Sequence, residues 1–342
     1  MSINKEFLQR DSNITSKVIC DSISESGKRI TTFELEYPRY IHCELLTHRM
    51  LSKNCSSSRA IPIEKMLGYI ENNMAVPVYL GRNKSGMQAV EEIEDKEPAL
   101  RFWKNSFVGV KSTVNLLTKL GLHKQIANRL TEPYQMMKVV VTATEWDNFF
   151  NLRIDKDAQP ELVMLADKMF NSMQESTPKT LKEGQWHLPY VDSIEYVEGD
   201  GGHGEYENNQ WYHIEGDGIA LEDAIKISVA SCAAVSYRTE NMSLAKADKI
   251  FDMLINAENL HSSPFEHVAK PITNEDLYSV DYTNPDLKTR VKNTLSAAKG
   301  ITHINSKGDF CSGNFTGWIQ YRHLLDNNTC NNFDYNNRMK SF

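Results

Sequence analysis

The sequence lacks any apolar run that approaches the roughly 20 residues of a membrane-spanning helix. Its first twelve residues, M-S-I-N-K-E-F-L-Q-R-D-S, contain no apolar core of a signal peptide. These two absences argue against a membrane protein and a secreted one. We therefore expect a cytoplasmic protein.

Paired cysteines and metal-binding spacings are also lacking. No C-x-x-C pair occurs among the six cysteines, which are Cys20, Cys43, Cys55, Cys232, Cys311 and Cys330. This spacing excludes a zinc module of the usual kind and disfavours a secreted disulfide framework, so we expect reduced thiols. His187, His203 and His213 lie in or near a Gly-rich stretch without a known ligand spacing, and we predict no metal site.

Positive charge is in deficit. The 38 Lys and Arg residues are outnumbered by 45 Asp and Glu, which gives a net charge of -7. A duplex-binding surface needs an excess of basic side chains, so bulk nucleic-acid binding is not expected. With 342 residues, of which 40% are hydrophobic, the chain can form one large domain or two moderate ones.

Strand-like and helix-like patterns are mixed along the chain, which predicts an α/β fold. Strands are expected within Lys17 to Tyr37 and over Lys138 to Thr144. Helical spacing occurs over 102–120, 122–133, 162–173, 220–237 and 244–260, and we expect the apolar residues of 102–120 to be core. We divide the chain into a catalytic part (1–184), a Gly/His-rich insertion or linker (185–219), a second catalytic part (220–325) and a mobile tail (326–342).

The segment from Ile41 to Pro62 carries the densest polar chemistry. Its apolar residues first follow helical spacing, and we expect the chain then to open into a loop with four consecutive residues C-S-S-S and two flanking arginines, Arg49 and Arg59. Guanidinium forks, hydroxyls and backbone N–H groups together suit a phosphate. The local composition fits a solvated Ser-rich turn equally well.

This segment resembles the signature of the flavin-dependent thymidylate synthase family, R-H-R-x-x-x-x-x-x-x-S. His48, Arg49 and Ser57 are in register, and Arg59 follows two residues later. Thr47 stands at the first arginine, and Cys55 stands where a glutamate commonly precedes the serine. Both departures fall at positions that contact flavin or nucleotide in the family.

A second resemblance lies at E-W-D-N-F-F-N-L-R-I-D-K-D-A-Q-P-E, which is similar to the family pattern N-F-x-N-L-R followed by A-Q-x-E. The resemblance implies that Arg153 contacts the pyrimidine ring and favours its ionisation, and that Asn148 contacts flavin. A guanidinium keeps its proton and so stabilises an adjacent anion. The alternative is a structural ion pair of Arg153 with Asp155, Asp157 or Glu161.

The helix before Pro133 corresponds to one that carries a phosphate-contacting arginine in the family. Arg129 is our candidate, with Asn128 as the alternative at that position.

A third motif, H-S-S-P-F-E-H at 261–267, resembles the family motif H-x-T/S-P-F-E-H. It ordinarily precedes the R-H-R signature and follows it here, so the chain resembles a circularly permuted member, which is tolerable where termini lie close together. His261, Ser263 and Glu266 would then lie at the flavin. The segment Q-x-R-H, which contains Gln320 and Arg322, partly matches the family motif Q-x-x-R-H-R.

The resemblance implies a central sheet packed by helices, in a homotetramer with shared active sites. It also implies methylation of dUMP at C5 to give dTMP, with FAD, NADPH and 5,10-methylenetetrahydrofolate. Arg153 would be catalytic. Substrate would contact Cys55, Ser56, Ser57, Ser58, Arg59, Arg129 and Arg153, and cofactor would contact Thr47, His48, Arg49, Asn148, His261, Ser263 and Glu266.

Two other functions and one other mechanism remain open at this point. The departures at Thr47 and Cys55 allow methylation or hydroxymethylation of another pyrimidine deoxynucleotide, such as dCMP. Cys55 as an attacking thiolate, its pKa lowered by Arg49 and Arg59, is a different mechanism. An inactive relative that only binds a nucleotide is the non-enzymatic alternative.

Overall fold

The fold is described from a computed structural model of the chain. It describes residues 5–86, 89, 91–195, 210–214, 217–235, 242–256, 260–274, 276–277, 289, 298–326 and 328–329. Contacts divide the chain into two compact units, one of Met1–Thr180 with Ser231–Asn241 and one of Leu181–Ala230 with Met242–Phe342. In the described ranges, no helix has the length and apolarity needed to cross a membrane.

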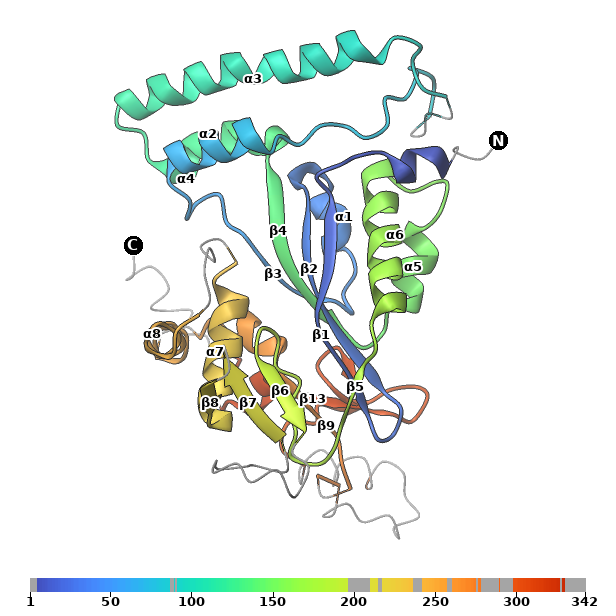
Figure 1. Cartoon of the computed structure of the whole chain (residues 1–342), viewed down its shortest axis with the longest axis vertical. Helices are drawn as coiled ribbons and strands as arrows, with labels where there is room; N and C mark the ends of the chain where they lie inside the picture. The colour runs from blue at the N-terminus through green and yellow to red at the C-terminus, as the bar shows by residue number, and fades with distance from the viewer. Residues whose placement is uncertain are drawn as a thin grey trace. The chain divides into compact units, whose positions relative to one another are not determined.

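The first unit is built on a five-stranded sheet (Figure 1). Its strands run in the spatial order β3, β4, β2, β1, β5, and their bounds are β1 Thr15–Ser24, β2 Arg29–Pro38, β3 Ser52–Cys55, β4 Met136–Ala143 and β5 Lys179–Leu181. β1 and β2 form a hairpin whose turn contains Gly27 at φ +79°, a left-handed conformation that glycine adopts without strain. The two strands predicted within Lys17 to Tyr37 and the strand predicted over Lys138 to Thr144 are confirmed.

A buried apolar cluster holds the sheet against two helices, α5 (Asp147–Arg153) and α6 (Pro160–Glu175). Phe33 and Leu35 from β2, Val139 from β4 and Leu165 and Met169 from α6 belong to this cluster, and each is fully buried. Helical spacing predicted over 162–173 is confirmed by α6, in which Leu162, Leu165 and Met169 are fully buried, Met173 is partly buried and Phe170 is 39% exposed. The α/β class with a central sheet packed by helices is also confirmed.

A second apolar cluster joins α2 (Ile63–Asn72), α3 (Lys96–Lys119) and α4 (Lys124–Ala127) at one end of the sheet (Figure 1). Phe107 and Val114 of α3 pack there against α2 residues such as Ile70. Gly121, at φ +84°, follows α3 and is the residue at which the helix ends.

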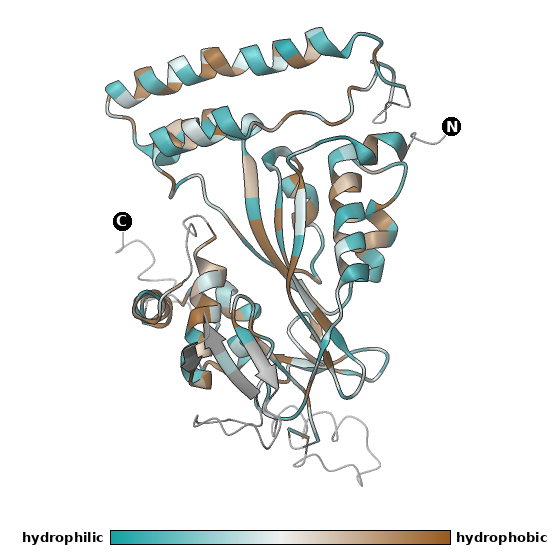
Figure 2. Cartoon of the chain, in the orientation of Figure 1, coloured by the Kyte–Doolittle hydropathy of each residue, from teal (hydrophilic) through white to brown (hydrophobic). Residues whose placement is uncertain are grey.

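The prediction that the apolar residues of 102–120 are core is wrong for one side of α3. Phe102 is 66% exposed and Leu120 is 83% exposed, and Figure 2 shows apolar residues distributed along the whole helix. The cause is that one side of this 24-residue helix packs in the second apolar cluster with α2, α4 and the segment 128–134, whereas Phe102 and Leu116 on its other side are exposed.

Two other sequence predictions are also wrong in this unit. The helix expected over 122–133 is only the four-residue α4, followed by a 3₁₀-helix, Asn128–Tyr134, that contains Pro133 and so lacks one backbone donor. The loop expected directly after Leu51 begins instead with strand β3, because the backbone of Ser52–Cys55 pairs with β4 at the edge of the sheet.

The second unit contains helices α7 (Leu221–Ala233, whose last three residues belong to the first unit) and α8 (Leu244–Ile255). Its strands are short: β6 Asp192–Glu195, β7 Gln210–Ile214, β8 Asp217–Ile219, β9 Ala269–Pro271, β10 His303–Ile304, β11 Phe310–Ser312, β12 Phe315–Thr316 and β13 Trp318–Gln320. The segment expected as an insertion or linker thus holds three paired strands, β6, β7 and β8. His203 and most of the predicted tail, 327 and 330–342, lie outside the described residues.

Candidate functional site

The first polar cluster forms where α1 (His42–Leu46) ends and the chain turns into β3. Leu45 and Leu51 are buried in the sheet cluster and fix this turn on both sides. The three residues between them that carry the first motif, Thr47, His48 and Arg49, are therefore presented at the surface by a rigid support.

Arg153, the last residue of α5, reaches this turn from 105 residues away in sequence. Its Nε donates a hydrogen bond to Nε2 of His48 at 2.7 Å, and its Nη1 forms an ion pair with Oε2 of Glu44 at 3.2 Å. Its Nη2 lies 3.3 Å from Oγ1 of Thr47. The structure thus joins the first and second sequence motifs in one cluster, which we call the Arg153 cluster.

The predicted alternative for Arg153, a structural ion pair with Asp155, Asp157 or Glu161, is wrong about the partner. Glu44 is the carboxylate that pairs with Arg153. Sequence reasoning missed Glu44, although it precedes Thr47 by three residues and so lies on the same helical face. That spacing was the signal that could have found it.

His48 is neutral in this cluster. Burial, then the positive charges of Arg153 and Lys53, lower the pKa of His48 to about 4. Because Nε2 accepts the hydrogen bond from Arg153, the ring proton resides on Nδ1. The ring also packs edge-on against Phe149, with centroids 4.9 Å apart, which fixes its orientation.

Arg49 and Asn148 flank the Arg153 cluster in sequence and are both exposed. Within the described ranges, no hydrogen bond or ion pair engages either side chain. A guanidinium and an amide left with all their donors are suited to the pyrophosphate and ring edges of a dinucleotide. Both side chains are therefore available to a ligand that offers hydrogen-bond acceptors.

The second polar cluster is the loop 56–59, which follows the other end of β3. Asn128 is fully buried, and its Nδ2 donates to the backbone oxygens of Ser58 at 2.8 Å and Ile61 at 2.9 Å. Lys124 donates to the backbone oxygen of Ala60 at 2.8 Å. Residues of α4 and the following 3₁₀-helix thus hold this Ser-rich loop in place.

The side chains of this loop alternate between exposed and more buried positions. Cys55, Ser57 and Arg59 are exposed, whereas Ser56 is half-buried and Ser58 is 3% exposed. The exposed set is the one in register with the first motif. In the part of the chain that the structure describes, no ion pair engages Arg59.

Arg129 and Asn128 have different environments. The buried Asn128 amide is engaged by the loop backbone, whereas Arg129 is exposed and its Nη1 pairs with Oε1 of Glu132 at 3.2 Å. Glu132 also pairs with Arg39 at 3.1 Å. Of the two sequence candidates, Arg129 is the one open to a ligand.

The Arg153 cluster and the Ser-rich loop lie at opposite ends of β3. A strand of four residues spans about 13 Å. In one copy of the chain, the structure therefore brings Arg153 to His48 but does not bring Arg153 to Ser57.

Cys55 does not have the environment of an attacking thiolate. Burial raises the pKa of its thiol, and Arg39 is the cation that opposes this rise. The lowering that was expected from Arg49 and Arg59 is absent. A nucleophilic cysteine needs the opposite shift in pKa.

The third motif lies in the second unit. His261 and Ser263 are exposed, while Glu266 forms an ion pair with Arg322. His267 is fully buried, and burial lowers its pKa to about 3. Gln320 is 1% exposed and its Nε2 donates to Asn314 at 2.7 Å, so it is part of the interior of this unit.

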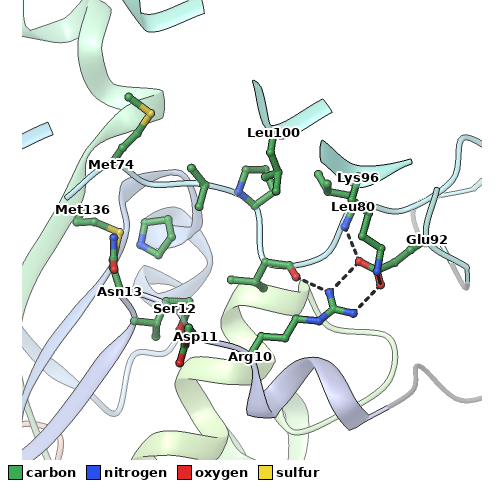
Figure 3. Close-up of a pocket in the computed structure, with 15 residues that line it drawn as sticks. Arg10, Asp11, Ser12, Asn13, Met74, Leu80, Glu92, Lys96, Leu100 and Met136 are labelled. Atoms are coloured by element: carbon green, nitrogen blue, oxygen red, sulfur yellow. Dashed lines mark hydrogen bonds and ion pairs between the residues drawn. The ribbon is translucent and has the colours of Figure 1, made fainter. Parts of the chain in front are cut away.

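A cavity of about 450 Å³ lies elsewhere in the first unit and contains none of the predicted site residues. In Figure 3 the guanidinium of Arg10 points toward Glu92, which also pairs with Lys96. The charges in its wall therefore neutralise one another. Over the described residues, no group of three or more His, Cys, Asp or Glu side chains is placed to hold a metal ion.

Comparison with known proteins gives three findings. Residues 29–179 match the family model described as thymidylate synthase complementing protein. A curated relative, the flavin-dependent thymidylate synthase of Thermosipho melanesiensis, is 28% identical over 156 residues, which cover 45% of this chain. The chain spans 66% of the length of that relative.

Two solved structures of a UMP/dUMP methylase from Streptomyces cacaoi, bound with 5-Br UMP and with 5-Br dUMP, are also similar. They are 17% and 16% identical, cover 48% of this chain and 90% and 91% of their own, and give TM-scores of 0.42 and 0.40.

The matched segment contains the first two motifs, the Arg153 cluster and the Ser-rich loop, and ends before the third motif at 261–267. The permuted order of segments therefore stays a prediction. The family predicted from the motifs is confirmed for residues 29–179, which match the family model of the thymidylate synthase complementing protein.

Proposed function

We propose that the chain is a flavin-dependent methyltransferase that converts dUMP to dTMP by methylation at C5. The single observation that carries this proposal is the Arg153 cluster, in which two separate family motifs meet through a 2.7 Å hydrogen bond. The name of the curated relative supports the same activity. NADPH as reductant and 5,10-methylenetetrahydrofolate as carbon donor complete the proposed reaction.

Arg153 is the proposed catalytic residue. Its Nε is engaged by the neutral His48 and one Nη by Glu44, so the guanidinium is held in one orientation with further N–H groups on Nη1 and Nη2. A fixed positive charge beside the pyrimidine stabilises negative charge on the ring as C5 becomes nucleophilic. No other proton donor is needed at this point, because a guanidinium remains protonated.

The exposed side chains of the Ser-rich loop are the proposed phosphate contacts. Ser57 and Arg59 lie on one side of the loop and Arg129 stands on the helix that supports it. Cys55 borders this side, and Ser56 and Ser58 shape the loop from within. Together they would hold the nucleotide by its phosphate and orient the base.

When bound, FAD would supply the hydride that completes the methyl group. Thr47, His48, Arg49 and Asn148 in the first unit, and His261, Ser263 and Glu266 in the second, are the residues proposed to hold it. The free donors of Arg49 and Asn148 fit this role. These residues would bind and orient the cofactor.

The separation of the Arg153 cluster from the Ser-rich loop supports shared active sites. One copy would provide Arg153 and another would provide Ser57 and Arg59. We propose the homotetramer of the family, with four chains of 39.1 kDa. Permutation of the segments and a cytoplasmic location belong to the same proposal.

The direct test is to purify the protein and look for a bound flavin. We expect a yellow protein with the absorption spectrum of oxidised flavin. With NADPH, methylenetetrahydrofolate and dUMP, mass spectrometry should detect dTMP. A protein that binds nucleotide but takes up no FAD and oxidises no NADPH would instead be the inactive relative.

A second candidate substrate is dCMP. Glu44 places a carboxylate beside Arg153, and a carboxylate accepts a hydrogen bond from the exocyclic amine of cytosine. The same assay with dCMP distinguishes the two bases, and the product mass distinguishes methyl from hydroxymethyl transfer. Turnover of dCMP with none of dUMP would replace the first candidate by the second.

A further inference from the structure

The inner side of the Ser-rich loop faces a cavity that the proposed function does not use. Ser56 and Ser58 line this cavity, which has a volume of about 240 Å³, whereas Ser57 and Arg59 do not. The other walls come from α2, through Lys65, Met66 and Tyr69, and from the start of β4, through Met136 and Lys138. All of these residues belong to the first unit.

The cavity wall is strongly biased toward positive charge. Three of its lining side chains are cationic, Arg39, Lys65 and Lys138, and none is acidic. Arg39 already pairs with Glu132, but over the described ranges no ion pair engages Lys65 or Lys138. Two unneutralised ammonium groups at one cavity favour an anion there.

Neutral donors beside these cations add to the same preference. The hydroxyl of Ser58 has one long contact, 3.4 Å to Oε1 of Glu132, and the residue is almost fully buried. Helix α2 begins at Ile63 without a side-chain cap, and Lys65 stands in its first turn.

We propose that this cavity is a second oxyanion site that binds a phosphate group, held by Lys65, Lys138 and the hydroxyls of Ser56 and Ser58. A tetrahedral dianion accepts several hydrogen bonds at once, which matches two ammonium groups and two hydroxyls. The volume suits inorganic phosphate or the phosphate of a small monoester. It is smaller than the cavities that hold drug-sized ligands.

Occupation of this site also fixes the outer side of the loop. Ser56 and Ser58 alternate with Ser57 and Arg59 along four residues of backbone. A phosphate bonded to the inner hydroxyls therefore restricts the positions of the outer side chains. This consequence rests on the proposed function, in which the outer side chains contact the nucleotide.

The test is calorimetric titration of the purified protein with inorganic phosphate, without flavin or nucleotide. We compare the wild type with the double variant Lys65→Met/Lys138→Met. The matched control is Lys104→Met/Lys119→Met, which removes two exposed lysines of α3. We expect at least tenfold weaker phosphate binding in the first double variant and wild-type binding in the control.

A third variant, Arg59→Met, separates this site from the nucleotide site. We expect Arg59→Met to keep phosphate binding. Loss of phosphate binding in Arg59→Met with retention in Lys65→Met/Lys138→Met would overturn the proposal, and so would the absence of binding to the wild type at millimolar phosphate.

Hydrogen exchange provides a second measurement on the same proteins. Phosphate should slow amide exchange over 55–60 in the wild type and in the control, but not in Lys65→Met/Lys138→Met. If the double variant unfolds, the single variants Lys65→Gln and Lys138→Gln replace it. None of these measurements uses flavin or catalysis. They therefore test the phosphate site even if the protein proves to have no methyltransferase activity.

Discussion

At the scale of single residues, the chemistry of the site depends on how Arg153 is held. Its guanidinium contacts an imidazole, a carboxylate and a hydroxyl, contributed by His48, Glu44 and Thr47. A lysine in this place keeps the charge but cannot contact all three, because its ammonium is a single point at the end of a flexible stem. The geometry of the fork therefore matters beyond its charge.

Replacing Arg153 by lysine should lower kcat/KM for the methylation by about 10²-fold to 10³-fold, the usual effect of removing one preorganised donor. The control is Arg82→Lys, since Arg82 is exposed and, among the described residues, pairs with the surface carboxylates of Glu91 and Glu94. Steady-state kinetics check both variants. Wild-type kcat/KM in Arg153→Lys would contradict the assigned role.

The protonation of His48 gives a prediction that needs no turnover. Its pKa is lowered to about 4 by burial and by the charge of Arg153, so the ring should stay neutral from pH 8 down to pH 5. In Arg153→Met the neighbouring charge is gone, and the pKa should rise toward 6.5. NMR titration of the imidazole measures both values, and an unchanged pKa in the variant would refute this cause.

At the scale of elements, α4 and the following 3₁₀-helix support the Ser-rich loop. The Ser and Arg content and the family motif predicted the functional loop from the sequence. This loop lies where the chain leaves β3. The sequence did not indicate β3 itself, because pairing of Ser52–Cys55 with β4 depends on a partner more than 80 residues away. Nor could local spacing show that Asn128 is buried, since this depends on the loop that covers it.

Asn128→Ala should destabilise the first unit and loosen the loop. It leaves the backbone oxygens of Ser58 and Ile61 without their buried donor, at a cost of about 2 kcal/mol or more. Urea denaturation measures the loss, and Asn115→Ala on the exposed face of α3 is the control, with an expected change below about 0.5 kcal/mol. Equal stability of the two variants would show that Asn128 does not support the loop.

At the scale of the whole molecule, the sequence predicted the fold class, the family and most of the long elements. Periodic burial is a local property, so β2, β4 and α6 followed from their own residues. The exposed side of α3 did not, because apolar spacing says which residues avoid water and not which neighbour is present to cover them. The meeting of Arg153 with Glu44 likewise depends on the fold that joins α5 to α1.

Buried histidines should make the molecule less stable in acid. Burial lowers the pKa of His42 to about 4 and that of His267 to about 3, whereas in the unfolded chain both titrate near 6.5. Below pH 6.5 the unfolded state therefore binds more protons. Stability is fully present above about pH 6.5 and is lost as the pH falls toward 4.

Thermal unfolding at pH 7.5, 6 and 5 checks this dependence, which His267→Gln should weaken. A melting temperature that does not change between pH 7.5 and 5 would show that these rings take up protons equally in the folded and unfolded states.

The most direct measurement of the central claim is release of tritium from dUMP labelled at C5. The account predicts that tritium enters water only when flavin, NADPH and methylenetetrahydrofolate are all present, and that Arg153→Lys slows this release at least 10²-fold. Tritium that stays on the base when the protein holds flavin and nucleotide and both NADPH and methylenetetrahydrofolate are present would contradict it.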